Sequence, residues 1–438
     1  MLPRLLPLSF PGKDADFDQQ LAVLRELLAG EAEFLPALPL GAPLPEAEAV
    51  LYPQMLGDAY RQLEDFRRIS LPQLIITSEF ATVSMWDWEI RDYLRRAGVP
   101  TLAPYNLEQT RLLCRALGVK RALRQGSFLV FQDNPGDGFQ ASIFKRFYWW
   151  EDECLQRIKD VFGLTVIQKS FKALGAAAKS IPDEQAAALW QTWQSRLAVD
   201  SLSPRAIFSA LKLYVALKRE LESDRAIHAM GINCLNESQF SDTTPCLAWD
   251  MLHEEAGLTW GCEADLLSML SQYILRHTLG APLMMTNLYP FLMGQAALKH
   301  EHIPQFPEVE QPENCILAAH CGYLGVLPRA FAASWTLRPK VLAIVDDNAS
   351  AIDARLPLGP ITLAKLTPTL DGFSAVEAEL TGYAQYPNSH CLNGAVIRVP
   401  DGPRLMEELV SHHYLILSGH HASAIALASQ VLFPPVSA

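Results

Sequence analysis

The sequence predicts an α/β protein in which two Rossmann-like parallel-sheet domains are followed by a C-terminal antiparallel β-barrel-like domain. Apolar strands alternate with amphipathic helices in residues 1–125 and again in residues 126–300, which is the pattern of parallel sheets. Residues 301–438 hold short strands separated by Gly, Pro, Asn and Asp, which is typical of an antiparallel barrel or sandwich. The expected domains are therefore 1–125, 126–300 and 301–438.

Each domain is predicted from its own succession of elements. In the first, a strand at 73–77 is followed by a helix over 85–97, a strand at 99–104 and a helix over 107–117. In the second, strands are expected at 128–131, 165–170, 226–234 and 283–286, with helices over 148–162 and 264–278. In the third, strands are expected at 316–320, 340–345, 359–366, 375–380, 394–399 and 414–419, and a proline-rich connector at 302–314 precedes them.

Composition excludes several classes of partner. The chain of 438 residues carries a net charge of −12, so it has no basic footprint for nucleic acid. Its eight cysteines form no C-x-x-C pair, which is typical of buried thiols in a reducing compartment. The N-terminus is a poor signal peptide, and Gly and Pro interrupt the longest uncharged run, at 278–298. We expect a cytoplasmic protein without a membrane span.

A carboxylate at the start of a buried helix is the first candidate for chemistry. The helix over 264–278 is apolar on nearly every face and ends at Gly280 and Pro282. The strand after it runs back along the helix, which returns Asn287 toward Glu263. The helix dipole stabilises a carboxylate in that position. Glu263 could also be only a first-turn carboxylate without a catalytic role.

Histidines gather near the C-terminus, where four of the eleven lie within ten residues: His412, His413, His420 and His421. Neutral imidazole is a metal ligand and titrates near neutrality. Composition alone leaves open a zinc site, a proton relay and a hydrogen-bonded edge of the β domain. The chain has no H-E-x-x-H, G-x-S-x-G, Walker or G-x-G-x-x-G string, so hydrolase and nucleotide-binding interpretations are disfavoured.

Three segments, in the same order, resemble the fucose/arabinose isomerase family from about residue 226 to the end. CEADLLSML with GAPLMMTN is similar to the family's C-E-x-D…G-x-P…D segment, and VSHHYLILSGHHASAIALAS resembles its terminal histidine segment. ILAAHCGYLGVLP resembles its H-C-G or H-M segment. The resemblance implies that Glu263 and residue 287 are metal ligands and acid/base groups. It also implies that His413 is a ligand, and that His320 is a further ligand or a sugar contact.

The resemblance implies a metal-dependent aldose–ketose isomerase. Such an enzyme removes a proton beside a carbonyl and passes through a cis-enediol, which a divalent cation holding two adjacent sugar oxygens stabilises. Mixed oxygen and imidazole ligands suit Mn²⁺, with Mg²⁺ or Co²⁺ as rivals. The family also implies a homo-oligomer, a trimer or hexamer, in which the first domain reaches a neighbour's site.

Asn287 departs from the family, because the family has Asp at this position. An amide oxygen can bind a hard cation, but it carries no charge and cannot take a proton. A nearby carboxylate, Asp242 or Asp250, could take the vacant role, or Glu263 alone could act as base on a different substrate. The protein could also be a non-catalytic carbohydrate-binding or regulatory protein that keeps the isomerase fold.

Further substrate contacts are expected from polar and aromatic side chains, and each has a structural alternative. The loop 236–248 follows a strand and offers amide and hydroxyl groups, or it forms turns and caps the next helix. The candidates are Trp86, Trp88, Asn236, Ser241, Thr243, His412 and His420. Tyr148, Trp149 and Trp150 are expected to pack in the core.

Overall fold

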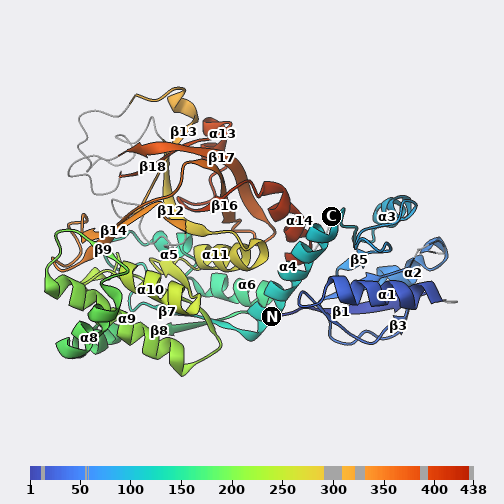
Figure 1. Cartoon of the computed structure of the whole chain (residues 1–438), viewed down its shortest axis with the longest axis horizontal. Helices are drawn as coiled ribbons and strands as arrows, with labels where there is room; N and C mark the ends of the chain where they lie inside the picture. The colour runs from blue at the N-terminus through green and yellow to red at the C-terminus, as the bar shows by residue number, and fades with distance from the viewer. Residues whose placement is uncertain are drawn as a thin grey trace. The chain divides into compact units, whose positions relative to one another are not determined.

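The computed structural model describes residues 1–10, 15–54, 57, 59–290, 308–320, 331–384 and 393–433. It is a mixed α/β protein with two parallel sheets and a closed antiparallel barrel, which confirms the predicted fold class. The described chain divides into two compact units (Figure 1). The first holds residues 1–125 with 277–279 and 423–438, and the second holds 126–276 with 280–422. Among the described residues, no helix is long and apolar enough to cross a membrane.

The first unit is built on a parallel sheet with strand order β2-β1-β4-β5-β6, in which β3 also pairs with β1. Its strands are β1 (Arg4–Ser9), β2 (Glu33–Phe34), β3 (Leu38–Pro39), β4 (Ala49–Tyr52), β5 (Gln73–Ile75) and β6 (Thr101–Leu102). Its helices are α1 (Ala15–Leu27), α2 (Leu63–Arg67), α3 (Asp87–Arg96) and α4 (Leu107–Gln125).

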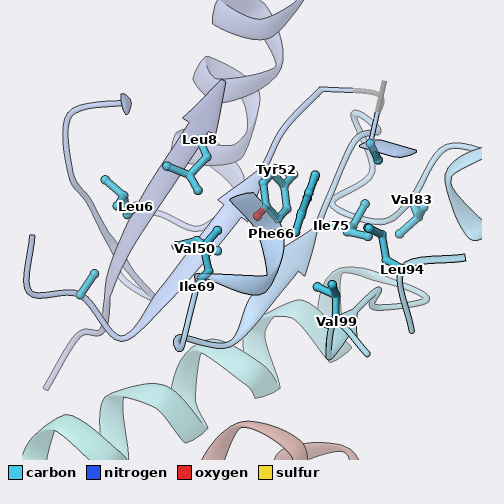
Figure 2. Close-up of a cluster of buried hydrophobic side chains, with 12 residues drawn as sticks. Leu6, Leu8, Val50, Tyr52, Phe66, Ile69, Ile75, Val83, Leu94 and Val99 are labelled. Atoms are coloured by element: carbon cyan, nitrogen blue, oxygen red, sulfur yellow. The ribbon is translucent and has the colours of Figure 1, made fainter. Parts of the chain in front are cut away.

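Aromatic and aliphatic side chains form the core of this first unit. The Tyr52 and Phe66 rings lie 5.2 Å apart, with Val50, Ile69 and Ile75 around them (Figure 2). The Tyr52 hydroxyl is buried and donates to Gln73 Oε1 at 2.8 Å, so it is hydrogen-bonded inside the core.

The second unit begins with a parallel sheet of order β11-β10-β7-β8. Its strands are β7 (Ser127–Phe131), β8 (Thr165–Lys169), β10 (Ile227–Ile232) and β11 (Thr259–Cys262). Its helices are α5 (Phe144–Phe147), α6 (Asp152–Phe162), α7 (Phe171–Lys179), α8 (Asp183–Trp193), α9 (Pro204–Ser223), α10 (Cys246–Ala256) and α11 (Leu266–Leu279), whose last turn belongs to the first unit. The helix predicted over 148–162 begins only at Asp152, because Trp149 has φ 63° and Glu151 is extended.

Six antiparallel strands close the barrel in the order β12-β13-β18-β17-β16-β19. They are β12 (Leu283–Pro290), β13 (Cys315–Ala319), β16 (Gly359–Leu366), β17 (Phe373–Ala384), β18 (Gly394–Arg398) and β19 (His413–Ser418). The short helices α13 (Gly402–Glu407) and α14 (Ala422–Leu432) precede and follow β19.

Two predictions about this part of the chain need correction. The strand at 283–286 was assigned to the second α/β domain, but it begins the barrel, because β12 pairs with β13 and β19. The proposed boundary at residue 300 lies outside the described residues. No strand forms at 340–345. The flanking strands β14 (Ser334–Pro339) and β15 (Ser350–Arg355) pair with each other, and β14 also pairs with β9 (Ala198–Val199), in a separate sheet.

Candidate metal centre

A strained turn between β11 and α11 presents the Glu263 side chain. Glu263 and Ala264 have φ values of 54° and 52°, a left-handed conformation that costs a non-glycine residue on the order of 1–3 kcal/mol. Gly231 on β10 permits the turn, because a Cβ there would lie 3.0 Å from the Ala264 Cα. The helix predicted to begin at Ala264 therefore begins at Leu266, after this turn.

The segment 148–150 holds this turn in place. Trp150 Nε1 donates to the Ala264 carbonyl at 3.0 Å, and the Leu266 amide donates to the Tyr148 carbonyl at 3.2 Å. Tyr148 was expected only to pack, but its hydroxyl donates to Glu263 Oε2 at 3.1 Å. Its buried ring also stacks on His413, with centroids 5.1 Å apart. Tyr148 thus belongs to the site.

The imidazole of His413 lies between two carboxylates. Its Nδ1 is 2.8 Å from Asp265 Oδ2, and its Nε2 is 3.1 Å from Glu263 Oε2. The pKa of Asp265 is held below its usual range: burial opposes this, and Lys365 and His413 outweigh burial. An ionised carboxylate only accepts hydrogen bonds, so Nδ1 carries the proton and donates it to Asp265. In the neutral ring the lone pair of Nε2 then points toward Glu263.

His413 Nε2 has no hydrogen-bond partner among the described residues, although Glu263 Oε2 is so close. In this tautomer two acceptor atoms face one another at a distance that suits a shared cation. Neighbouring ligands at about 2.2 Å from one ion lie roughly 3 Å apart. A histidine whose second nitrogen donates to a carboxylate is the usual arrangement of a metal-bound histidine.

Buried partners fix Asp265. It is the N-cap of α11, where its side chain accepts from the Ser268 amide at 2.9 Å. Lys365 from β16 reaches the same carboxylate, with its Nζ 3.2 Å from Oδ2, and both side chains are buried. Burial lowers the pKa of Lys365, while Asp265 acts in the opposite direction. The positive charge of Lys365 balances the negative charge of Asp265. The negative charge of Glu263 is therefore the one available to an added cation.

Gln140 also contacts Glu263. Its Nε2 donates to Glu263 Oε1, and its backbone amide donates to Asn236 Oδ1 at 3.0 Å. Asn236 is buried and also donates to the Asn134 carbonyl at 3.2 Å. Asn236, predicted as a substrate contact, therefore holds the loop that carries Gln140.

The charge states of the two central groups follow from this arrangement. Burial alone would raise the pKa of Glu263, but His413 outweighs burial and the pKa is lowered. Burial alone would lower the pKa of His413, but Asp265 and Glu263 outweigh it and the pKa is raised. Without a metal, the two groups favour a carboxylate beside an imidazolium. A divalent cation competes with that second imidazole proton for the same position.

Asn287 and His320 lie beside this pair. Asn287 on β12 is directly opposite His413 on β19, so their side chains share one face of the barrel wall. Asn287 Nδ2 donates to Tyr289 at 3.0 Å, while its buried Oδ1 has no hydrogen-bond partner among the described residues. His320 is buried, and within the same described part of the chain neither of its ring nitrogens is hydrogen-bonded.

Glu263, Asn287 and His320 line one cavity of about 80 Å³. The rest of its lining comes from Cys234, Leu235, Thr244, Pro245, Cys246, Cys262, Tyr289, Leu342 and Val345. This volume holds an ion with water, or the reacting end of a small ligand. His413 approaches Glu263 at 3.1 Å and lies opposite Asn287 on the neighbouring strand.

His412 completes the group of potential donors. One ligand atom from each of Glu263, His412 and His413 lies within 4.8 Å of the others. Burial, and next the charge of His413, lower the pKa of His412 to about 3, so it stays neutral near pH 7. Its Nε2 lies 3.4 Å from the Tyr148 hydroxyl. The donor set of carboxylate, amide oxygen and imidazole suits Mn²⁺ or a similar divalent ion.

Other predicted site residues have different surroundings. His420 lies two residues past the end of β19, at the opposite end of this strand from His413, and its Nδ1 is 3.6 Å from Glu377 Oε2. Trp86 is 59% exposed and Trp88 packs against the core of the first unit. Neither tryptophan belongs to the second unit, which holds the carboxylate and histidine donors.

The polar side chains in and near the 236–248 loop, which were proposed to contact substrate or to act in place of Asn287, form hydrogen bonds with other protein groups. The Ser241 hydroxyl accepts from the Thr243 amide at 3.2 Å, and the Thr243 hydroxyl donates to the Thr244 carbonyl at 3.4 Å. Asp242 accepts from the Ser209 hydroxyl at 3.1 Å, and Asp250 accepts from Trp335 Nε1 at 2.9 Å. Neither Asp242 nor Asp250 lines the cavity, so neither fills the role that Asn287 leaves vacant.

Four contributors were not predicted from the sequence: Gln140, Tyr148, Asp265 and Lys365. Only Asp265 gave a local signal, since an Asp directly before an apolar helical run is a typical N-cap. The other three reach the site from residues more than a hundred positions from Glu263 or from another strand.

The family resemblance rests on short motifs. A comparison with models of known protein families finds no match, and no curated protein matches the sequence. Function is therefore inferred from the residues of the site.

Proposed function

We propose that this chain is a metal-dependent aldose–ketose isomerase, similar to fucose and arabinose isomerases, that acts on a free sugar through a cis-enediol. The observation that carries the proposal is the approach of His413 Nε2 to Glu263 Oε2 at 3.1 Å, with His413 Nδ1 bound to Asp265. Asn287 Oδ1 and the ring nitrogens of His320 are further potential metal ligands, because none of these atoms has a hydrogen-bond partner among the described residues.

Glu263, His413, Asn287 and His320 would hold the ion, with His412 beside them. Mn²⁺ suits this donor set best, and Mg²⁺ or Co²⁺ are rivals. When bound, the ion would supply positive charge for two adjacent sugar oxygens as the enediolate forms.

The protein's own groups would move the proton. Glu263 is ionised near neutrality because its pKa is lowered, so it can accept a proton from the carbon beside a carbonyl. The Tyr148 hydroxyl and the Gln140 amide, which donate to opposite oxygens of Glu263, would fix the plane of its carboxylate. The remaining donors of the cavity would orient the sugar hydroxyls.

One observation favours a second candidate function, a non-catalytic carbohydrate-binding or regulatory protein. An amide at position 287 cannot transfer a proton, and the described cavity lining has no carboxylate other than Glu263. Such a protein would bind a sugar without converting it, so turnover separates the two functions.

The testing experiment is a panel of aldoses and ketoses incubated with the protein and Mn²⁺, Mg²⁺ or Co²⁺ in D₂O. We expect the isomer of one sugar to appear with deuterium on the carbon that bore the exchanged proton, and Glu263→Gln to abolish both signals. Binding of a sugar without isomer or exchange would support the second function. Full isomerase activity in Glu263→Gln would contradict proton transfer by Glu263.

We also propose a homo-oligomer in the cytoplasm, because the family resemblance implies a trimer or hexamer. Light scattering at several protein concentrations measures the mass directly. A monomer at all concentrations would contradict this part of the proposal.

A further inference from the structure

Two thiols meet at the edge of the cavity. The sulfur atoms of Cys234 and Cys262 lie 3.7 Å apart, and neither cysteine is in a disulfide. The fold brings them together because β10 and β11 are neighbouring parallel strands in which Ile232 is opposite Cys262. A tight turn follows β10, where the Cys234 amide donates to the Ile232 carbonyl at 2.8 Å. Cys234 therefore turns back toward the end of β11.

Both cysteines line the cavity that contains Glu263. Cys234 is partly exposed and Cys262 is buried, so Cys234 is the more accessible of the two to a small reagent. Cys246 lines the same cavity. Cys114 and Cys154 are buried away from the cavity lining.

We infer that Cys234 and Cys262 form a reversible disulfide when the protein meets hydrogen peroxide. The Cys234 thiolate attacks one peroxide oxygen, the O–O bond breaks, and the leaving hydroxide takes a proton to become water. The Cys262 thiolate then attacks the sulfenic sulfur, the S–O bond breaks, and a second water leaves. The two thiols together lose two electrons, and hydrogen peroxide gains them. An external dithiol reverses the reaction by exchange.

The bond would act on the neighbouring metal centre. Closing the sulfur atoms from 3.7 Å to about 2.05 Å pulls Cys262 toward Cys234. Cys262 is joined directly to Glu263, which sits in the strained turn at φ 54°. A shift of that turn would change the position of the Glu263 carboxylate relative to His413. This consequence rests on the proposed metal site, whereas formation of the disulfide does not.

The test is peptide mapping of the oxidised native protein. The reduced protein is treated with hydrogen peroxide, its free thiols are alkylated under denaturing conditions, and it is cleaved after glutamate. Glu237 separates Cys234 from Cys246, and Glu254 separates Cys246 from Cys262, so each cysteine lies on its own peptide. Trypsin would leave all three on one peptide, since no Lys or Arg lies between residues 225 and 276.

We expect one linked pair, the Cys234 and Cys262 peptides, which a dithiol separates again. Cys246→Ser is the matched control from the same cavity and should keep the link, whereas Cys234→Ser and Cys262→Ala should each lose it. Two results would overturn the inference. One is a sulfinic acid on Cys234 together with a fully alkylated Cys262 in the same oxidised sample, and the other is a disulfide that involves Cys246. Manganese titration of the same samples should show affinity at least tenfold weaker after oxidation. An unchanged affinity with the link present would overturn only the coupling to the metal site.

Discussion

Replacing Asn287 by Asp changes the charge of the metal centre at a single position. The Asn287 amide nitrogen already donates to Tyr289, so the unpartnered Oδ1 is the atom available to an ion. Asn287→Asp puts an anionic oxygen there, opposite His413 on the neighbouring strand. A charged group in place of a neutral one in a buried contact contributes about 1.5–3 kcal/mol. The Mn²⁺ affinity should therefore rise by roughly ten- to a hundredfold.

The same substitution should destabilise the metal-free protein, because two carboxylates then share one buried cavity. Repulsion between unit charges about 5 Å apart is on the order of 3 kcal/mol at an effective dielectric constant of about 20. Chemical denaturation without metal measures this cost, and calorimetric titration with Mn²⁺ measures the gain. Asn106→Asp is the charge-matched control, since Asn106 is an exposed cap of α4 whose side chain accepts from the Gln109 amide.

If Asn287→Asp left both the Mn²⁺ affinity and the metal-free stability unchanged, residue 287 would not face the ion. Turnover on the sugar panel adds information about the chemistry. A rise in isomerisation together with affinity would show that the vacant acid/base position had limited the rate.

Two further predictions concern the residues around the centre. Asp265→Asn should weaken Mn²⁺ binding by about ten- to a hundredfold, because His413 loses the carboxylate that fixes its tautomer; equal affinity in calorimetric titration would contradict that role. Burial, and next the charge of Arg276, lower the pKa of His253 in the folded protein to about 4. In the unfolded chain the pKa of His253 is near 6.5, so between pH 6.5 and pH 4 the unfolded chain binds a proton that the folded chain does not. The unfolding free energy should thus fall by at most about 2 kcal/mol from pH 7 to pH 5 through this residue. His253→Gln should remove that part of the slope in denaturation curves, and an unchanged slope would contradict the assignment.

The fold class was predictable because local pattern and tertiary role agree in most elements. Strands such as β7 and β10 are apolar runs between helices, and β16, β17 and β18 are runs of 8, 12 and 5 residues between turn residues. The start of the barrel was not predictable in this way. β12 follows a buried helix of the α/β part and is itself apolar, and only its pairing with β19 from the chain's end assigns it to the barrel.

The site was predictable only where its residues form contiguous motifs. Glu263, Asn287 and His413 stand in segments that resemble a family, whereas Tyr148 and Lys365 carry no such signal. Tyr148 lies among aromatic residues that suggest packing, and its role depends on the left-handed Trp149 after it. Lys365 on a strand would ordinarily face solvent, yet it is buried because Asp265 provides the opposite charge.

A second group of potential ligands tests whether metal binding is specific to the proposed centre. Among the described residues, Glu151, Glu153 and Cys154 also lie close together. Arg146 already pairs with both of these glutamates, which leaves little net negative charge for a cation. Glu153→Ala is therefore a suitable control for any loss of metal binding elsewhere.

The most direct test is the stoichiometry of Mn²⁺ binding to the protein purified without chelator. We predict one ion per chain, released by chelation and by acid as His413 is protonated. The double substitution Glu263→Ala with His413→Ala should abolish binding, and Glu153→Ala should leave it intact. Stoichiometric binding that survives the double substitution would contradict a metal centre at Glu263 and His413.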